Sequence, residues 1–358
     1  PGYSSPVQIP GTNWAYGSPS SDSFMLATKS DGTLWAWGNN DEGQLAQNDA
    51  VNIVEKTMVS VSKRIPLLPL RTVMDLGQER KLGVMPGALG SEDTYGIKVL
   101  SLFPENPSKG LSSHIGLMLL FDPKTGMPTA AINADALTAV RTAAATAVAT
   151  KHLAIKDATS MTIIGSGEQA EFHVKSIPLV RPIKNINVVG TTKYKAENLI
   201  VKMAPIYPSI LFEAHDRADK IVGNSDIICT VTSSKDPVIF GDWIQNSTHI
   251  NAVGASIPIF QEIDETVLLK SKVFVDYRPS VFAQAKEIIE AIKAKTINEN
   301  HIKAEIGEII EGEKVGRESN EEITLYRSMG LAAQDLACAE FILEKAIEKN
   351  VGVHAPTS

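Results

Sequence analysis

The sequence predicts an α/β protein with a parallel sheet and a second, mixed α+β domain, and three observations support this fold class. From residue 160 onward, short apolar strands alternate with helices, as in βαβ units. Between residues 66 and 121, strand follows strand with turns between them. A glycine turn, Gly165-Ser166-Gly167, joins the first strand of the alternating part to its helix.

Composition sets limits on the class of protein. The 358 residues are 43% hydrophobic and 21% charged, which is typical of a soluble globular protein with room for two domains. The net charge of −7 argues against nucleic acid as a partner, and no apolar run is long enough to span a membrane. The polar start, Pro1 to Ser5, predicts no signal peptide.

The two cysteines point to a reducing compartment. Cys229 and Cys338 lie in apolar runs, so we expect buried thiols and a cytoplasmic protein. No cluster of Cys and His residues has the spacing of metal ligands, and we expect no metal site.

Residues 1–50 form a predicted segment of a different kind. They are rich in Ser, Gly, Asn and Asp, and the run Asp31 to Gly38 alternates as a β-hairpin does. With Asn39 to Leu45, this run resembles one repeat of the regulator-of-chromosome-condensation β-propeller. One repeat cannot close a propeller, so the segment is a piece of a longer array, a fusion or an added element.

The next part of the chain predicts the mixed domain, over residues 55–149 with 322–358. Strands are expected at Arg71 to Val73, Gly96 to Phe103 and Leu117 to Phe121. The long helix Ala134 to Ala154 is dominated by alanine, which lets a neighbouring backbone approach closely. The final helix, Met329 to Lys349, would return to this domain.

The glycine turn predicts a dinucleotide site. A strand, Met161 to Ile164, precedes the pattern G-x-G-x-x-A formed by Gly165, Gly167 and Ala170. Free N–H groups at the start of the following helix would face a pyrophosphate. Glycine turns also close ordinary βα connections, so the turn alone leaves both interpretations open. We predict a Rossmann NAD(P)-binding domain over residues 150–321.

The second strand of this domain, Ile186 to Gly190, suggests which dinucleotide binds. It is followed by Thr191, Thr192 and Lys193, with no carboxylate to repel a 2′-phosphate. We therefore expect NADP(H) to be preferred, with NAD(H) as the alternative. An ordinary polar loop is the competing interpretation.

Several motifs in one order carry a resemblance to a known family. They are Phe121 to Gly126, Leu137 to Ala144, Gly165 to Ala170, Asp226 to Thr232, His249 to Ala255, Glu305 to Ile309 and Ser328 to Gly330. From about Pro66 to Ala346 the chain closely resembles the ornithine cyclodeaminase/mu-crystallin family. The run Phe240 to Ser256 resembles the ketimine-reductase branch most. The family's N-terminal helical segment is expected to be missing, which leaves the assembly of a dimer open.

The resemblance implies an NAD(P)H-dependent oxidoreductase acting on C–N bonds, and a homodimer. The expected reaction is reduction of a cyclic ketimine carboxylate, of the pyrroline- or piperideine-2-carboxylate type, to the cyclic imino acid. An ornithine cyclodeaminase, an alanine dehydrogenase and a non-catalytic NADP(H)-binding crystallin-like protein are the alternatives. The partner would be a small imino or amino acid.

Three basic residues are expected to bind anions. Arg141 lies in an apolar helix, where an arginine needs an anion unless it reaches solvent or a structural partner. The family implies that it contacts cofactor phosphates or the substrate carboxylate. Lys98 lies in an apolar strand and could point to solvent, but the resemblance makes it a catalytic substrate ligand that binds a carboxylate or lends a proton. Arg71 matches a second carboxylate ligand.

The remaining expected site residues contact the cofactor or the reacting amine. His114, beside Ser113, is either a proton relay or polar filler. Ser256 stands where cyclodeaminases carry an aspartate, and a serine cannot act as a carboxylate base near neutral pH. The expected cofactor-binding residues are Ser113, Arg141, Gly165, Ser166, Gly167, Glu168, Gln169, Gly190, Thr191, Thr192, Lys193, Thr230, Thr232, Ser233, Val253 and Ser328.

Overall fold

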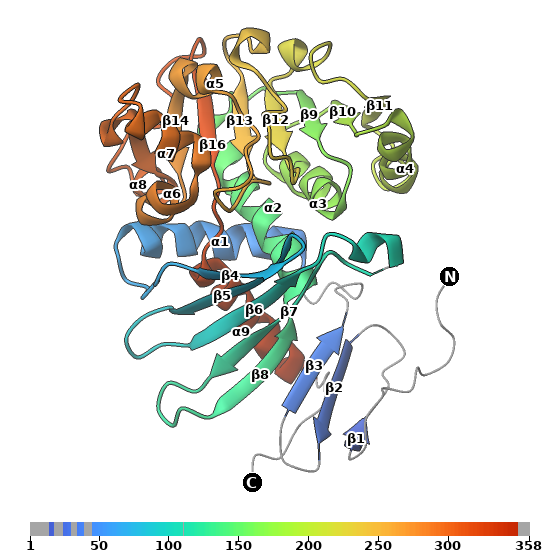
Figure 1. Cartoon of the computed structure of the whole chain (residues 1–358), viewed down its shortest axis with the longest axis vertical. Coiled ribbons are helices and arrows are strands. Elements are labelled where there is room, and N and C mark those ends of the chain that lie inside the picture. The colour runs from blue at the N-terminus through green and yellow to red at the C-terminus, as the bar shows by residue number, and fades with distance from the viewer. Residues whose placement is uncertain (1–13, 18–23, 30–33, 39–44, 110, 350–358) are drawn as a thin grey trace. The chain divides into compact units, whose positions relative to one another are not determined.

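The computed structural model describes residues 14–17, 24–29, 34–38, 45–109 and 111–349. The chain divides into two compact units (Figure 1). Unit 1 comprises Pro1–Ala46, Pro66–Thr138 and Asp335–Ser358, and unit 2 comprises Gln47–Ile65 and Ala139–Gln334. None of the helices in the described part of the chain is long and apolar enough to cross a membrane.

Unit 2 contains an eight-stranded parallel sheet. Its order is β11-β10-β9-β12-β13-β16-β14-β15, so β10 and β11 extend the sheet on one side of β9 and β12 and β13 on the other, while the last strand, β16, lies between β13 and β14. This is the doubly wound arrangement, with its switch point between β9 and β12, and it confirms the predicted fold class. The strands are β9 (Ser160–Ile164), β10 (Asn185–Val189), β11 (Leu211–His215), β12 (Ile227–Thr230), β13 (His249–Ala252), β14 (Ser271–Val275), β15 (Ile302–Glu305) and β16 (Ile323–Arg327).

Helices flank this sheet and cover its apolar strands. Helices α3 and α4 lie beside the β9–β11 half, and α5 to α8 lie beside the β14–β15 half (Figure 1). Strands β12 and β13 are buried along their whole length, as expected for central parallel strands. The helices are α2 (Ala134–Leu153), α3 (Glu168–Ser176), α4 (Lys193–Met203), α5 (Glu265–Lys270), α6 (Arg278–Gln284), α7 (Lys286–Lys293) and α8 (Ile306–Ile310).

An additional helix, α1 (Gln47–Ser62), belongs to unit 2 and corrects one expectation. We expected the N-terminal helical segment to be missing, but α1 buries Val51, Val54 and Met58 at helical spacing. A Cβ on Gly307 of α8 would lie 2.1 Å from the Met58 carbonyl oxygen, so only glycine permits this approach. The expectation was wrong because the first turn of α1 lies at the end of the polar stretch of residues 1–50, where composition does not indicate a helix.

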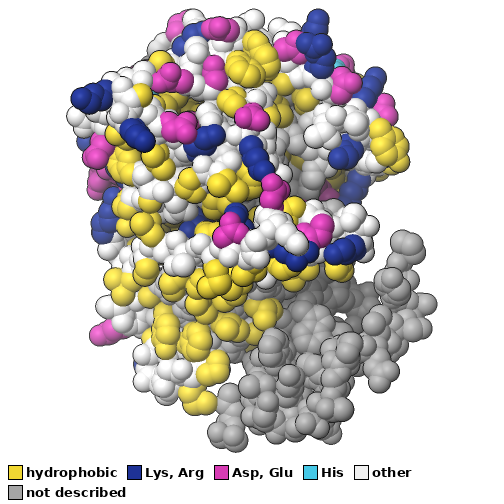
Figure 2. All heavy atoms as spheres, in the orientation of Figure 1, with side chains coloured by type: hydrophobic (Ala, Val, Ile, Leu, Met, Phe, Trp, Pro, Cys, Tyr) yellow, Lys and Arg dark blue, Asp and Glu magenta, His cyan; other side chains and the backbone are white. Residues whose placement is uncertain are grey.

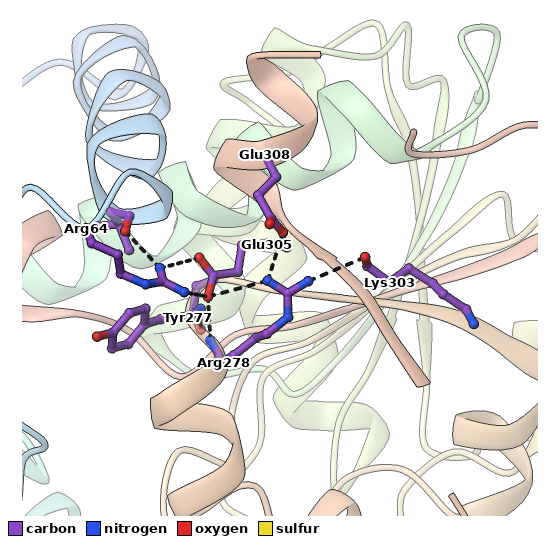
Figure 3. A network of polar contacts seen from close by, with 8 residues as sticks. Arg64, Tyr277, Arg278, Lys303, Glu305 and Glu308 are labelled. Atoms are coloured by element: carbon purple, nitrogen blue, oxygen red, sulfur yellow. Dashed lines mark hydrogen bonds and ion pairs between the residues drawn. The ribbon is translucent and has the colours of Figure 1, made fainter. Parts of the chain in front are cut away.

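Glu305 links the residues after α1 to the rest of unit 2 (Figure 3). Its buried carboxylate accepts hydrogen bonds from Arg64 Nη1 and Nη2, at 2.7 and 2.8 Å. It also accepts one from the Arg278 N–H at 2.9 Å, while the Arg278 guanidinium pairs with Glu308 at 2.8 Å. The guanidinium of Arg64 lies over the Tyr277 ring. This network fixes the C-terminal end of α1 to β15 and α8.

Unit 1 contains a five-stranded antiparallel sheet in the order β4-β5-β6-β7-β8, together with helix α9 (Ala332–Glu348). A Cβ on Gly96 would lie 3.1 Å from Leu336 Cδ2, which shows that α9 packs closely against β6. The strands are β4 (Thr72–Gly77), β5 (Arg80–Ala88), β6 (Tyr95–Leu102), β7 (His114–Phe121) and β8 (Pro128–Asn133).

A separate three-stranded antiparallel sheet precedes α1. It consists of β1 (Trp14–Gly17), β2 (Phe24–Lys29) and β3 (Leu34–Gly38). The paired strands β2 and β3 agree with the predicted hairpin, whose turn at Asp31 and Gly32 lies outside the described residues.

Candidate functional site

The glycine turn after β9 has the geometry of a dinucleotide-binding turn. Gly165 has φ +119°, and a Cβ there would lie 2.8 Å from the Val231 carbonyl oxygen, so the position requires glycine. Gly167 is the N-cap of α3, and no atom lies within 4 Å of where its Cβ would be. The turn therefore leaves open space directly in front of a helix N-terminus.

The donors at this helix start fit a pyrophosphate. The N–H groups of Ala170 and Glu171 bond to the Gly167 carbonyl oxygen. Among the described residues, the preceding N–H groups of Gly167, Glu168 and Gln169 have no backbone acceptor. Free N–H groups, the helix dipole and the absence of a Cβ suit an anion.

The loop after β10 lies next to this turn. A Cβ on Gly190 would lie 3.3 Å from Ser166 Oγ, so the structure brings these two predicted residues together. Thr191, Thr192 and Lys193 are exposed, and Thr192 also caps α4 by accepting a hydrogen bond from the Lys195 N–H. Residues 190–193 contain no carboxylate.

A buried carboxylate, Glu262, holds the loops that follow β12 and β13. It accepts hydrogen bonds from the N–H and hydroxyl of Thr232, at 2.6 and 2.8 Å. It also accepts from the N–H groups of Gly254 and Ala255, at 2.7 and 3.1 Å. Burial raises the pKa of Glu262, and the hydrogen bonds from Thr232 oppose that rise. Glu262 thus holds together the loops after β12 and β13, and the ends of these two strands are expected to line the cofactor site.

The other predicted residues of these strand ends occupy the same loops. Thr230 is the last residue of β12, and its carbonyl oxygen accepts hydrogen bonds from the N–H groups of Val253 and Gly254. Thr230 and Val253 are buried, whereas Ser233 is exposed. A Cβ on Gly254 would lie 2.0 Å from the Thr232 carbonyl oxygen, which makes glycine necessary there as well.

Arg327 connects the predicted residues Ser256 and Ser328. Its buried guanidinium pairs with Glu287 and donates hydrogen bonds to the carbonyl oxygens of Ala255 and Ser328. The Ser328 N–H bonds to the Ala252 carbonyl oxygen at 3.0 Å. Ser256 therefore follows a residue whose carbonyl is fixed, and it is partly exposed.

Arg141 lies in α2 and is 5% exposed, which rules out the solvent-reaching alternative. Its Nη1 donates to Gln334 Oε1 at 3.2 Å. A Cβ on Gly330, which has φ +72°, would lie 2.7 Å from Arg141 Nη1. Asp276 fixes the backbone at Gly330, because its carboxylate accepts hydrogen bonds from the N–H groups of Met329 and Gly330. Arg141 thus lies against the segment that follows Ser328.

Lys98, in unit 1, is 1% exposed, so the alternative of a solvent-facing lysine is also ruled out. Its Nζ lies 3.0 Å from Oδ1 of Asp335, which is fully buried. The strand register pairs Lys98 with Met85 on one side and with Met118 on the other. Arg71 immediately precedes β4, and continuing the register of β4 and β5 places it opposite Met85.

Ser113 and His114 lie at the start of β7 in the same unit. Ser113 Oγ is 3.0 Å from His114 Nδ1. The His114 ring has access to solvent, yet desolvation by the surrounding protein, followed by the positive charge of Lys98, lowers its pKa. A neutral imidazole near neutral pH is therefore favoured at this position.

Comparison with known proteins identifies the family. A model of the ornithine cyclodeaminase/mu-crystallin family matches residues 39–350. The chain belongs to this family. A model of the regulator of chromosome condensation repeat matches residues 20–44, in agreement with the predicted N-terminal segment.

Relatives of this ornithine cyclodeaminase/mu-crystallin family member carry several names. A Delta(1)-pyrroline-2-carboxylate reductase of Bacillus thuringiensis is 32% identical over 88% of the chain and 97% of the relative. An alanine dehydrogenase of Archaeoglobus fulgidus is 34% identical over 87% and 94%. The solved Thermococcus litoralis Delta(1)-pyrroline-2-carboxylate reductase, in complex with NADH and L-proline, has a TM-score of 0.84 and 36% identity, over 88% and 97% of the two chains.

Sequence reasoning missed four polar residues of this family member: Glu262, Asp276, Arg327 and Asp335. Each is buried, and each forms a hydrogen bond with a residue far away in the sequence. The available signal was a charged residue inside an apolar run, as in Leu325 to Leu331.

Proposed function

We propose that the chain reduces a cyclic ketimine carboxylate, of the pyrroline- or piperideine-2-carboxylate type, to the cyclic imino acid with NAD(P)H. The observation that carries this proposal is the buried amino group of Lys98, in register with Arg71 across the antiparallel sheet. The pair supplies a carboxylate ligand and a proton-bearing group on one surface. The relatives named Delta(1)-pyrroline-2-carboxylate reductase support the choice of substrate.

The proposed roles follow from where the residues lie. Arg71 and Lys98 bind the substrate carboxylate, and Lys98 provides the proton that the imine nitrogen acquires. The turn at Gly165, Ser166, Gly167, Glu168 and Gln169 holds the pyrophosphate. Other proposed cofactor contacts lie at the ends of β12, β13 and β16, and they are Thr230, Thr232, Ser233, Val253 and Ser328. Ser113 is a further proposed cofactor contact, and Arg141 a ligand for an anion. When bound, the dinucleotide supplies the hydride.

We also propose that NADP(H) is preferred over NAD(H). The exposed residues Thr191, Thr192 and Lys193 offer hydrogen bonds and a positive charge, with no carboxylate among residues 190–193 to exclude a 2′-phosphate. The Thermococcus litoralis relative was solved with NADH, so the two cofactors must be compared directly.

A homodimer is proposed from the open face of the antiparallel sheet. Register places Met74, Leu82, Val84, Val99, Ile115 and Leu117 on the face opposite Lys98. None of these residues is fully buried, and Met74 and Ile115 are 55% and 45% exposed. Hydrophobic side chains gather over this sheet in Figure 2. A solved archaeal alanine dehydrogenase dimer, 32% identical with a TM-score of 0.82, supports a second copy as the occupant.

We also propose that the protein is located in the cytoplasm. Cys229 and Cys338 are both buried thiols, and burial raises the pKa of Cys229 to about 12, which makes it unreactive. Buried unmodified thiols suit the reducing conditions of the cytoplasm.

The deciding experiment is a substrate panel. NADPH and NADH oxidation is measured with pyrroline-2-carboxylate, piperideine-2-carboxylate and pyruvate plus ammonia, and ammonia release is measured with ornithine. The proposal predicts fastest turnover with a cyclic ketimine. Faster turnover of pyruvate plus ammonia would favour the alanine dehydrogenase alternative, and tight dinucleotide binding without turnover would favour the crystallin-like alternative.

A further inference from the structure

The buried ion pair between Lys98 and Asp335 carries a further inference. We propose that Asp335 is a positioning residue, which keeps the Lys98 amine protonated and directed so that it can deliver a proton to the substrate. This proposal rests on the proposed reduction, because it gives the pair a role in that reaction.

The surroundings of Lys98 show why it needs such a partner. Its cross-strand neighbours are Met85 and Met118, and Met118 is fully buried. Removing water from an ammonium group lowers its pKa, and a lysine among apolar side chains tends to lose its proton. The Asp335 carboxylate, 3.0 Å away and equally buried, opposes that loss.

The packing of α9 brings Asp335 to this position. Asp335 lies in the first turn of α9, and Gly96, two residues before Lys98, permits the helix to approach β6. The same helix is also anchored by a hydrogen bond from the Thr94 hydroxyl to Glu340. The helix thus has apolar and polar anchors besides Asp335, so a charged pair is not needed merely to hold it.

Other charged groups lie on the Lys98 side of the sheet in unit 1. They are Arg71, Lys81 with its partner Asp75, His114, and Glu340 bonded to Thr94. Asp135 accepts a hydrogen bond from the Gly116 N–H of β7. Asp335 is in direct ion-pair contact with Lys98.

The reaction step balances in atoms and charge. The π bond of the imine breaks, a hydride forms the new C–H bond, and a proton from Lys98 forms the new N–H bond. Lys98 is left as a neutral amine and regains a proton from solvent. Without the Asp335 charge, Lys98 would lose its proton at a lower pH than in the wild-type protein, so proton delivery would begin to fail earlier as pH rises.

The test measures the protonation of Lys98 directly. Protein labelled with [ε-¹³C]lysine is titrated by NMR without substrate, and the Lys98 signal is assigned with Lys98→Met. We expect the wild-type midpoint to lie at or above about pH 10.4, the ordinary value for a lysine in water. In Asp335→Asn the midpoint should fall by about 1–3 pH units, and Asp335→Glu should restore most of it. Glu340→Gln, on the same helix, should leave it unchanged.

Kinetics provide the second readout. The alkaline limb of kcat with a cyclic ketimine should move to lower pH in Asp335→Asn, while KM changes less. An unchanged Lys98 midpoint in this variant would overturn the inference even if the protein reduces ketimines. A shifted midpoint without turnover of any cyclic ketimine would instead refute the proposed function. If Asp335→Asn does not fold, a wild-type Lys98 midpoint below about pH 10.4 overturns the inference.

Discussion

Arg71 and Lys98 lie in one row across the antiparallel sheet, with Met85 between them. Neighbouring strands are about 4.8 Å apart, so the two side chains leave the sheet roughly 10 Å from each other. This spacing allows the Arg71 and Lys98 side chains to contact one small anion from two sides. It also separates the two roles, because a guanidinium binds a carboxylate bidentately whereas an ammonium can also give up a proton.

Replacing Arg71 by lysine should therefore weaken substrate binding more than it slows chemistry. The charge remains, but the bidentate geometry is lost, so we expect KM for a cyclic ketimine to rise on the order of tenfold to a hundredfold with a smaller change in kcat. Steady-state kinetics check this. Arg80→Lys is the matched control, since Arg80 lies in β5 of the same sheet and already pairs with Glu105. A similar loss in both variants would contradict the proposed role of Arg71.

Ser256 should decide which branch of the family chemistry the protein performs. The unmodified protein should release little ammonia from ornithine, because the serine hydroxyl cannot remove a proton from an ammonium near neutral pH. Ser256→Asp should raise ornithine cyclisation and lower ketimine reduction, as measured by ammonia release and NADPH oxidation. The adjacent Ile257→Val variant serves as a control for local disturbance. Efficient cyclisation by the wild-type protein would refute this assignment.

Lys193 should contribute to cofactor choice. A 2′-phosphate carries negative charge, so Lys193→Glu should reduce kcat/KM for NADPH on the order of tenfold and leave NADH nearly unchanged. The control is Lys195→Glu, at an exposed lysine two residues further into α4. Equal or better kinetics of the wild-type protein with NADH would contradict the preference.

Stability should fall as pH decreases from 6.5 toward 4. Burial lowers the pKa of His173 to about 4 and that of His249 to about 3. Between the folded and unfolded pKa values, the unfolded state binds more protons, so the free energy of unfolding decreases with decreasing pH. His173→Gln should remove roughly 3 kcal/mol of this dependence. Urea unfolding at several pH values measures this pH dependence of the free energy of unfolding. The control is His301→Gln, at a partly exposed histidine. An unchanged slope in His173→Gln would refute the argument.

The N-terminal segment should be dispensable for cofactor binding only up to the start of α1. Deleting residues 1–38, which precede the family match, should leave the affinity for NADPH unchanged. Deleting residues 1–62 should weaken it, because α1 packs against α8 and Gln47 bonds to the Val140 carbonyl oxygen of α2. Fluorescence titration with NADPH distinguishes the two. A large loss with the shorter deletion would show that the segment completes the fold.

Local signals were enough to predict the parallel sheet and its glycine turn. The alternation of strands and helices, the Gly165 turn and the long α2 helix all depend on residues close together in the chain. Residues 281–295 have the apolar spacing of a single helix, yet they belong to two helices, α6 and α7, because Ala285 adopts an extended conformation. No proline or glycine marks that break.

Long-range pairing explains what the sequence did not predict. Glu262 and Arg327 acquire their importance from carbonyl and N–H groups that only the folded sheet brings to them. Strand register, which aligns Arg71 with Lys98, cannot be read from one sequence, because apolar alternation alone allows more than one offset. Both kinds of information require the tertiary structure.

The separation of Lys98 from Asp335 by 237 residues has a consequence for synthesis on the ribosome. Strands β4 to β8 emerge first, the entire parallel sheet follows, and α9 is translated after both. During elongation, the lysine therefore has no access to its carboxylate and remains hydrated on an incomplete sheet. The antiparallel sheet should acquire its final protection against hydrogen exchange only after translation of α9, later than the parallel sheet, although its strands precede that sheet in the chain.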